Sequence, residues 1–424
     1  MARKKSALFF ISHFFLIFLW IMNGGSVYSV IQRNMLLAAL TAYMIFLYII
    51  YGSRIRQALV SAFIFGIIII SSCILIDYIF SIKPQDGSKY AFLLIQFVVA
   101  GLLCIYLFSV FTYEDFLQLF YKVLKFIRWH ALISAVFISA LPFLFTTHIT
   151  NDYTGYDAYS SLFIFFKLSK QYAFEIFGLS LTRNQGLFWE PGVLQFYLNL
   201  LLFMQLYVFK PKPLGIVLTV AALLTTYSTS AYLIMLIVGS IAIVQSIKRR
   251  PGIYFPLTVL VLLLFIPFVQ ANVENKFNGE EHNSSLARIM DVVQQAVVIE
   301  SNFMTGVGID EERYAIIRSQ YKIKGYYEDQ TQTVAIDRGS TNSILFILAT
   351  IGIPMGVLWL YAYIWQPFIQ HKKLLFSILI LLAVFVEPLL LKPFFLTLMM
   401  GGFMSIYYGI RYKKKGRVWL NLIE

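Results

Sequence analysis

The stretch ALVSAFIFGIIIISSCILIDYIF, from Ala58 to Phe80, contains a single charged residue, Asp77, in a run long enough to cross a lipid bilayer. A transmembrane helix needs about 20 mostly apolar residues. Apolar runs of this kind recur along the whole chain of 424 residues, of which 59% are hydrophobic and only 13% charged. This composition excludes a water-soluble enzyme and predicts one polytopic membrane domain over residues 1–424.

Transmembrane candidates account for most of the chain, so we expect an all-α fold with about 12 spans. In chain order the candidates run over 7–22, 35–51, 58–80, 90–111, 129–145, 192–209, 214–227, 231–247, 253–269, 343–365, 374–391 and 394–410. The seventh is short and lies so close to the eighth that the two also fit a single bent pair of helices. Residues 113–130 carry apolar side chains at helical spacing and predict an interfacial helix.

Positive charge gathers at the ends of these spans. If the spans alternate from a cytoplasmic amino terminus, 20 of the 34 Lys and Arg but only three of the 21 Asp and Glu fall on the cytoplasmic side. Cytoplasmic loops of membrane proteins carry such an excess of Lys and Arg. The pattern predicts that both termini are cytoplasmic, and it explains the net charge of +13 without a nucleic-acid partner.

The two cysteines, Cys73 and Cys104, both fall inside apolar stretches. Cysteines in such positions pack as small apolar side chains, and their number and spacing form neither a disulfide framework nor a zinc motif. We therefore expect no metal and no cofactor.

Two connections are much longer than the others, and both are predicted to lie outside the cytoplasm. They cover residues 146–190 and 270–341, and loops of this length are usually functional or disordered. The first contains apolar pieces that suggest interfacial or re-entrant packing. In the second, residues 286–299 predict an amphipathic helix with Ile289 and Val293 on its apolar face and Asp291 on its polar face.

The segment RNQGLFWEP, from Arg183 to Pro191, combines features of a binding or catalytic site. Its glycine permits a tight backbone turn, and Glu190-Pro191 begins a predicted span with an acid at the positive end of the helix. An arginine and a carboxylate close to a membrane indicate a functional site. A structural ion pair between Glu190 and Arg183, with helix capping, explains the same residues equally well.

The second long loop supplies further candidates. Arg288 opens its predicted helix, where a guanidinium and the free N–H groups of the first turn could together hold an anion. Arg338 and Asn342 would lie at the amino end of the span that starts at residue 343. His148 and His282 lie in the outer loops, where either could act as a base near neutral pH, although solvent-exposed histidines are the commoner case.

Other polar residues near the same face have simpler explanations. Arg313 and Arg318 stand in a charged stretch and are expected to pair with loop acids. Glu387 is expected to pair with Lys392, five residues further along the chain. The Gly-x-Gly turn in NFMTGVGID, from Asn302 to Asp310, is too common a feature to indicate a site by itself.

These motifs, in this order, resemble the O-antigen polymerase and ligase superfamily. The resemblance covers about Arg183 to Gly356, and only the topology agrees outside it. It rests on RxxGxxxEP before a helix, the serine-rich helix break TTYSTSAY at 225–232, Arg288 at the start of a loop helix, NxxxGxG at 302–308, and TN separated by nine residues from a glycine at 341–352.

The resemblance implies an integral-membrane glycosyltransferase of the GT-C type that acts on undecaprenyl-diphosphate-linked glycans. Arginines of the two large outer loops engage the diphosphates in this family, and Arg183 and Arg288 are the positions that match, with Arg338 as a weaker match. We expect Glu190 to be the base that deprotonates the incoming hydroxyl, with His282 as the second choice. Fixed arginines and helix amino ends would stabilise the leaving diphosphate without a metal.

One position distinguishes the branches of the family. O-antigen ligases carry a His-Asn pair at the mouth of the helix that begins near residue 343, whereas this chain has Thr341 followed by Asn342. The missing histidine favours a polymerase of the Wzy type, which transfers a growing glycan to the next lipid-linked repeat unit of O-antigen, capsule or another exopolysaccharide.

The resemblance also implies the setting and partners of the protein. We expect a multi-pass protein of the bacterial inner membrane that acts on undecaprenyl-diphosphate-linked oligosaccharide, contacts membrane lipids and works with a chain-length regulator. The alternatives are an O-antigen ligase and a flippase for the same lipid-linked oligosaccharide. A transporter would place charged residues near the middle of the bilayer and show paired repeats, and the sequence has no clear repeat.

Overall fold

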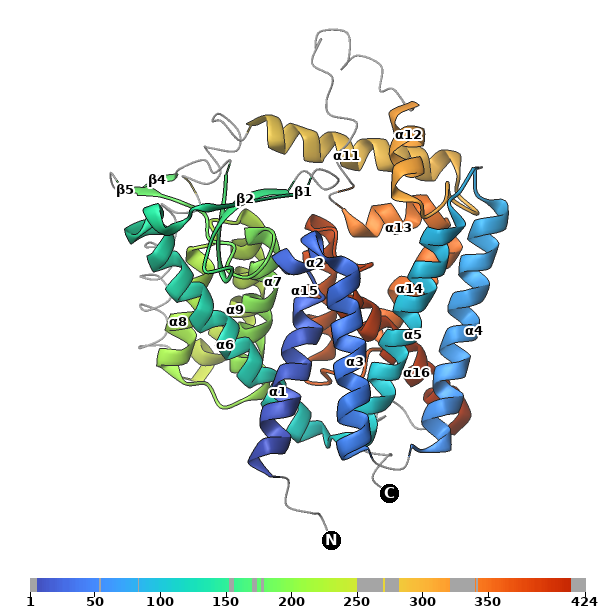
Figure 1. The fold of residues 1–424 in the computed structure, drawn as a ribbon, viewed down its shortest axis with the longest axis horizontal. Coiled ribbons are helices and arrows are strands. Elements are labelled where there is room, and N and C mark those ends of the chain that lie inside the picture. Colours follow the sequence, from blue (N-terminus) through green and yellow to red (C-terminus); the bar gives the residue numbers. More distant parts are fainter. Residues whose placement is uncertain are drawn as a thin grey trace.

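A computed structural model gives the fold of the chain, which is mostly helical (Figure 1). It describes residues 6–52, 55–82, 84–151, 156–169, 174–176, 179–249, 270, 282–320, 340 and 342–412. The predicted span at 253–269 lies outside the described residues.

All the described strands fall between residues 147 and 181, and the described elements before and after them are helices. The helices are α1 (Ala7–Met22), α2 (Val27–Ile31), α3 (Arg33–Tyr51), α4 (Gln57–Phe80), α5 (Gly87–Val110), α6 (Tyr113–Ala140), η1 (Pro142–Leu144), α7 (Pro191–Phe203), η2 (Met204–Val208), α8 (Pro213–Leu224), α9 (Thr229–Arg249), α11 (His282–Ser301), α12 (Glu311–Gln320), α13 (Ser343–Ile351), α14 (Ile353–Ile364), α15 (Lys373–Val386) and α16 (Pro393–Tyr412). The strands are β1 (Thr147–Asn151), β2 (Tyr156–Ser161), β3 (Phe165–Leu168), β4 (Phe174–Ile176) and β5 (Leu179–Leu181).

The helices form an apolar bundle with the character of a polytopic membrane protein. Among the described residues, six helices are long and apolar enough to cross a membrane, and five further apolar helices are 10–17 residues long. Large apolar side chains point away from the bundle, such as Ile49 and Ile68, which are 77% and 60% exposed. Such a surface is stable against lipid and not against water. The polytopic class is therefore confirmed, and the total of about 12 spans stays a prediction.

Local signals explain where several helices begin. Ser6, Asp86 and Thr112 each accept a hydrogen bond from a backbone N–H in the first turn of α1, α5 and α6. These side chains satisfy N–H groups that have no partner within the helix. Helix α7 begins at Pro191 and α16 at Pro393. Proline at this position costs no hydrogen bond, because the first N–H group of a helix has no partner within the helix.

Helix α6 differs from the prediction. Residues 113–130 are the first part of one continuous helix of 28 residues, and not a separate interfacial helix before a span at 129–145. The apolar stripe that suggested a lipid interface is buried, with Phe116, Phe120 and Ile127 each at most 3% exposed. Helices α1, α7 and α8 pack against α6. These helices cover the apolar stripe that the sequence alone would assign to a lipid interface.

The described part of the first long loop forms strands, which departs from the all-α expectation. Strands β1, β2 and β3 form an antiparallel sheet in that order, and β4 pairs with β5. In β2 the side chains of Tyr156, Ala158 and Ser160 are buried, which is the two-residue period of a strand with one covered face. The apolar pieces of this loop therefore contribute strands to small sheets, and their interfacial or re-entrant packing stays a prediction.

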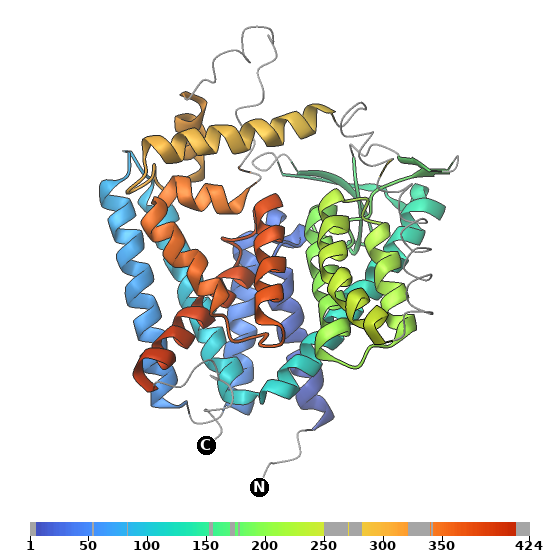
Figure 2. The same cartoon turned by 180° about the vertical axis from the view of Figure 1, so that it is seen from behind.

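One end of the bundle is covered by the two long loops. Helices α11 and α12 and strands β1–β3 lie across this end, which we call the loop face, whereas α1 begins and α16 ends at the opposite end (Figures 1 and 2). The predicted polar face of α11 is turned inward: Asp291 is 7% exposed, whereas Ile289 is 53% exposed. The reason is an ion pair between Asp291 and Arg318 of α12, which also bears out the expected pairing of Arg318 with a loop acid.

Helix α16 packs closely against its neighbours because it presents small residues to them. It contacts α4, α5 and α14. A side chain at Gly402 would place its Cβ 1.9 Å from the carbonyl oxygen of Ala362 in α14, whereas a Cβ at Gly409, two turns further on, would meet nothing within 4 Å. Small residues allow this kind of backbone approach between membrane helices.

The pair of glycines provides a test of the packing. We expect Gly402→Ala to destabilise the detergent-solubilised protein by about 1–3 kcal/mol, because the added methyl group must push α14 and α16 apart. Gly409→Ala should leave stability unchanged or raise it slightly, because alanine favours a helix more than glycine does. Thermal unfolding of the two variants measures the difference. Equal melting temperatures for the two would contradict the described α14–α16 packing.

Candidate functional site

The segment Arg183–Pro191 forms a fixed strip on the loop-face side of the bundle. Its backbone pairs with the turn between α1 and α2, since the N–H of Val27 donates to Leu187 O at 3.0 Å and the N–H of Trp189 donates to Gly25 O at 3.3 Å. The side chain of Asn184 donates to Ala131 O at 2.7 Å and accepts from the N–H of Gly186 at 3.0 Å. Gly186 has a φ of +55°, which glycine adopts most readily. The strip is therefore a rigid platform.

Arg183 lies at the start of this strip, against the turn between α8 and α9. Its Nε donates to Thr226 O at 3.5 Å, and the backbone N–H of Asn184 donates to Thr225 O at 2.9 Å. The structure thus brings the RNQGLFWEP strip and the serine-rich break TTYSTSAY together.

Glu190 ends the non-helical part of the strip, directly before α7. Its side chain makes no capping hydrogen bond. Among the described side chains, Glu190 and Arg183 form no ion pair within 4.0 Å, so the predicted structural alternative of a paired and capping Glu190 is not what the structure contains. Burial, and to a smaller degree the charge of Glu190, raises the pKa of Tyr156, whose hydroxyl accepts from Gln185 Nε2 at 2.9 Å.

The glycine turn at 302–310 meets the break between α13 and α14. The N–H of Val307 donates to Ala349 O at 3.0 Å, and that of Gly308 donates to Thr350 O at 2.9 Å. A Cβ at Gly306 would lie 2.1 Å from Thr350 O, so only glycine permits the approach. Two motifs of the resemblance, NxxxGxG and the glycine at the end of TN-x9-G, are therefore in backbone contact.

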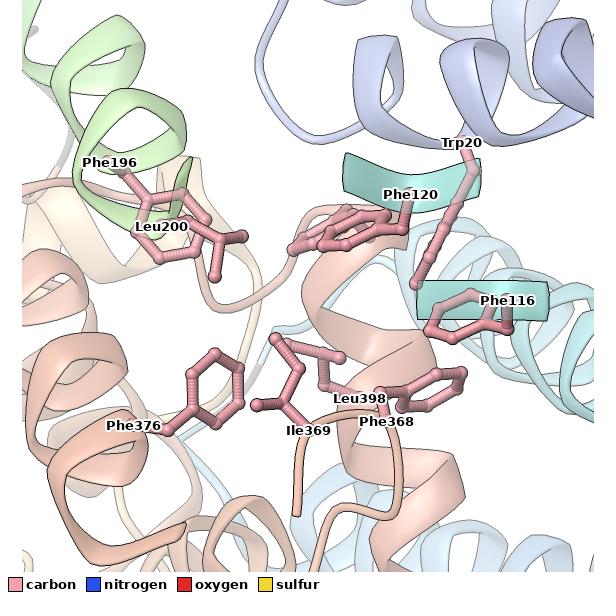
Figure 3. Close-up of a pocket in the computed structure, with 10 residues that line it drawn as sticks. Trp20, Phe116, Phe120, Phe196, Leu200, Phe368, Ile369, Phe376 and Leu398 are labelled. Atoms are coloured by element: carbon pink, nitrogen blue, oxygen red, sulfur yellow. The ribbon is translucent and has the colours of Figure 1, made fainter. Parts of the chain in front are cut away.

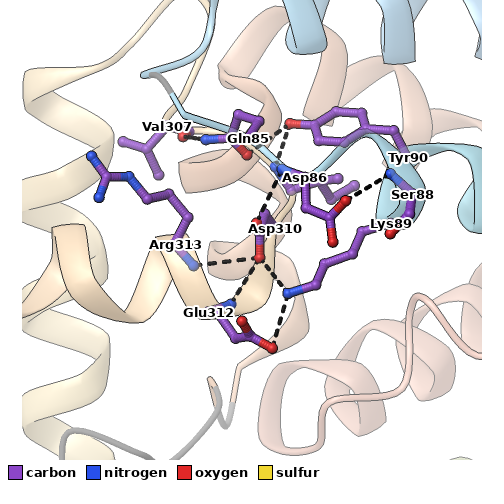
Figure 4. A network of polar contacts seen from close by, with 10 residues as sticks. Gln85, Asp86, Ser88, Lys89, Tyr90, Val307, Asp310, Glu312 and Arg313 are labelled. Carbon is purple, nitrogen blue, oxygen red and sulfur yellow. Dashed lines mark hydrogen bonds and ion pairs between the residues drawn. The ribbon is translucent and has the colours of Figure 1, made fainter.

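The same segment is tied to the turn between α4 and α5 by a polar network (Figure 4). Lys89 forms ion pairs with Asp310 at 2.7 Å and with Glu312 at 3.1 Å. Gln85 donates to Val307 O at 2.9 Å, and the N–H of Asp86 donates to Asp310 Oδ2 at 3.3 Å. This network positions the second long loop relative to the bundle.

Asn342 caps α13. Its Oδ1 accepts from the N–H groups of Ile344 and Leu345, both at 3.0 Å, and the residue is 1% exposed. Its Nδ2 has no hydrogen-bond partner in the part of the chain that the structure describes. The next residue, Ser343, binds the connection between α15 and α16: its hydroxyl donates to Glu387 O at 2.6 Å and accepts from the N–H of Leu389 at 2.7 Å.

Three helix amino ends therefore converge below the loop face. The connection 387–392 joins them: it binds the start of α13 through Ser343, it precedes α16, and it reaches α7, where a Cβ at Gly192 would lie 1.7 Å from Glu387 Oε1. A helix amino end carries a partial positive charge and free N–H groups, and it attracts anions. The expected pairing of Glu387 with Lys392 is wrong, because Glu387 lies against the start of α7 and Lys392 Nζ lies over the ring of Trp189, 4.6 Å from its centroid.

Not all predicted site residues can be placed. Arg338 and Thr341 lie outside the described residues, and His282 and Arg288 belong to the first part of α11, whose side chains also lie outside them. The amino-terminal part of α11 crosses the loop face toward the side of α7 and α9 (Figures 1 and 2). His148, the other candidate base, binds Asp157 at 2.6 Å within the small sheet and is half exposed.

The structure adds site candidates that the sequence did not predict. Tyr156 of β2 reaches the strip from the first long loop, and Lys392, expected only as the partner of Glu387, lies over Trp189 near the other end of the strip. Within the described ranges, no three His, Cys, Asp or Glu side chains gather in a group able to hold a metal ion.

A cavity of about 10 Å³ lies deeper in the bundle and is not the site (Figure 3). It is lined only by aromatic and aliphatic side chains, among them Trp20, Phe196 and Phe394. This volume barely admits one water molecule. The polar residues described above lie elsewhere, so the cavity is a packing gap with no role for a diphosphate or sugar.

Comparison with known families supports the sequence resemblance. Residues 214–360 match the family model described as O-antigen ligase. The matched region includes the turn between α8 and α9, α11, the glycine turn and the start of α13, whereas the RNQGLFWEP strip precedes it. No curated protein matches the chain. The chain thus contains an O-antigen ligase family region at residues 214–360, consistent with the superfamily of O-antigen ligases and polymerases.

Proposed function

We propose that the protein is a polysaccharide polymerase that transfers a growing glycan from undecaprenyl diphosphate to the sugar hydroxyl of a lipid-linked repeat unit. The observation that carries the proposal is the convergence of the amino ends of α7, α13 and α16 beside the strip that bears Arg183. This arrangement suits a reaction in which negative charge develops on a departing diphosphate. The loop face would then be the extracytoplasmic face of the bacterial inner membrane, with both termini in the cytoplasm.

In this mechanism the arginines hold the leaving group. Arg183 is anchored on the α8–α9 turn and would contact the donor diphosphate, with Arg288 of α11 and Arg338 contributing from the second long loop. A guanidinium offers a planar fork of donors that stays charged in this environment. Asn342 would add the N–H of its buried amide at the amino end of α13, next to Thr341.

Glu190 is the proposed base. Deprotonation of the acceptor hydroxyl requires a carboxylate that is not neutralised by a neighbouring cation, and Glu190 makes no ion pair with Arg183. The hydroxyl oxygen attacks the anomeric carbon of the donor sugar, the bond from that carbon to the diphosphate breaks, and the proton passes to Glu190. His282 is the second candidate, since it begins α11 on the same face.

Two features favour this function over its rivals. A polymerase agrees better than a ligase with Thr341 at the position where ligases carry histidine. An enzyme agrees better than a flippase with polar residues that gather below the loop face, because transporters bind their substrate near the middle of the bilayer.

Arg183→Ala tests the assignment to the donor diphosphate. In cells that make the polysaccharide, we expect polymer formation to fall by about 10²–10³-fold, because the transition state loses a fixed charged donor. Single repeat units should still be displayed at the surface, which electrophoresis of the glycan detects. Arg56→Ala, an exposed arginine at the opposite end of the bundle, should behave as wild type. Accumulation of repeat units on the cytoplasmic face would instead indicate transport.

Glu190→Gln tests the base. The amide preserves shape but cannot take a proton, so we expect the polymerisation rate of the purified protein to fall by about 10²–10⁴-fold. Binding of the lipid-linked donor should change little. Glu114→Gln, which alters an exposed acid in the first turn of α6, is the matched control. A wild-type rate for Glu190→Gln together with a large loss for His282→Gln would transfer the role to His282.

A further inference from the structure

A buried arginine of α6 lies on the side of the bundle away from the loop face. Arg128 is 4% exposed, and its Nη1 donates to the carbonyl oxygen of Gly215, in the first turn of α8, at 3.1 Å. Helix α7 begins below the loop face and crosses the bundle together with η2, so the start of α8 lies toward the opposite end (Figures 1 and 2). Arg128 is therefore separate from the candidate site described above.

The guanidinium of Arg128 has no carboxylate partner. None of the described carboxylates lies within 4.0 Å of it. The elements that pack against α6 are α1, α7, α8, β3 and η1, and their sequences contain no Asp or Glu. The only acids of α6 itself are Glu114 and Asp115, about 20 Å from Arg128 along the helix axis. Burial of a charge without a counter-charge is unfavourable, so this position calls for an anion that these elements do not supply.

Two polar atoms beside this guanidinium are also unsatisfied. In the part of the chain that the structure describes, Arg128 Nε and Gln205 Oε1 have no hydrogen-bond partner. Gln205 belongs to η2 and is 3% exposed, and its Nε2 donates to the same oxygen of Gly215 at 3.2 Å. A buried polar atom without a partner is uncommon in folded proteins and requires a ligand or water that satisfies it. One donor and one acceptor are therefore available at the same place.

Gly215 leaves this buried pair close to the surface of the bundle. A Cβ at Gly215, which is itself half-buried, would lie 3.4 Å from Gln205 Nε2, 3.9 Å from Arg128 Nη1 and 3.9 Å from the Cβ of Lys212. Lys212 is exposed, and so is Trp129, whose ring centroid lies 5.0 Å from the guanidinium carbon of Arg128. Tryptophan is enriched at the level of the lipid headgroups. A headgroup at this level could therefore meet Arg128 from beneath and Lys212 from the side.

The combination suits a phosphate. The amino end of α8 is positively polarised, and Lys210 and Lys212 directly precede it. A guanidinium is the side chain that binds phosphate oxygens most specifically. Basic positions between membrane helices on the cytoplasmic side bind the headgroups of anionic lipids. The chemistry therefore favours a phosphate that is presented by the membrane itself.

We propose that Arg128, Gln205 and the amino end of α8 bind the headgroup of an anionic phospholipid from the leaflet opposite the loop face. Arg128 and Lys212 would hold the phosphate, and Gln205 Oε1 would accept from a hydroxyl of a glycerol headgroup. The bound lipid would fix α8 against α6, and α8 leads directly into the turn that holds Arg183. The binding itself does not depend on the proposed polymerase activity.

Native mass spectrometry of the full-length protein in detergent, titrated with dioleoyl phosphatidylglycerol, measures the affinity of this site. We expect Arg128→Met to weaken phosphatidylglycerol binding by about tenfold or more, because the phosphate loses a charge-assisted hydrogen bond. Arg128→Lys keeps the charge and should keep most of the affinity. Arg56→Met is the matched control, since it removes an exposed arginine at the same end of the bundle. Equal losses in Arg128→Met and Arg56→Met would overturn the proposal.

Thermal unfolding separates lipid binding from a structural role of Arg128. In lipid-free detergent, Arg128→Met should melt no lower than the wild type, because it removes an unpaired buried charge and leaves Gly215 O with two other donors, Gln205 and Thr219. Added phosphatidylglycerol should raise the melting temperature of the wild type and not that of Arg128→Met. A lower melting temperature for Arg128→Met by the same amount with and without the lipid would mean a purely structural arginine and would overturn the proposal.

Competitors identify the source of the phosphate. Phosphatidylcholine, whose headgroup has no net charge, should bind at least about tenfold more weakly than phosphatidylglycerol. Inorganic phosphate at the same concentration should not displace phosphatidylglycerol, because it lacks the acyl chains that hold the headgroup in place. Equal affinity for the two lipids, or displacement by inorganic phosphate, would overturn the assignment to an anionic phospholipid.

Discussion

The amino end of a helix inside an apolar bundle leaves backbone N–H groups that require partners, and this constraint organises the centre of the protein. Helices α7, α13 and α16 all begin below the loop face, and the connection 387–392 runs between them. Asn342 accepts from two N–H groups at the start of α13, and prolines remove part of the demand at α7 and α16. Glu387 lies against the start of α7, and the proposed chemistry would use the remaining N–H groups of the three helix starts for diphosphates.

Rigid supports surround this region. The strip with Arg183 and Glu190 is held by the α1–α2 turn and by Asn184, and the glycine turn of the second long loop is held by the α13–α14 break and by Lys89. Fixed donors stabilise developing charge without reorganisation during the reaction, which is the main electrostatic contribution to catalysis in many enzymes. Gly306 and Gly352 matter here because two backbones approach each other directly.

The sequence predicted what depends on local signals. The bounds of α1 agree with those expected, and α4 and α16 agree within a residue or two, because apolar length is read from one segment at a time. The sequence did not predict the strands β1–β3, because pairs such as His148 and Tyr159 form only when separate segments meet. The juxtaposition of Trp189 with Lys392, 203 positions apart, and of Arg33 with Gln96 depends on tertiary packing in the same way. The contact of Arg183 with the α8–α9 turn is likewise a result of tertiary packing.

The central claim is that lipid diphosphate binds where the amino ends of α7, α13 and α16 converge. The most direct test is an electron cryo-microscopy structure of the full-length protein in nanodiscs with undecaprenyl diphosphate. We expect density for the diphosphate beside the strip Arg183–Pro191, below α11, with the polyprenyl chain leaving toward the lipid. Diphosphate density at the opposite end of the bundle, near the start of α1, would contradict it.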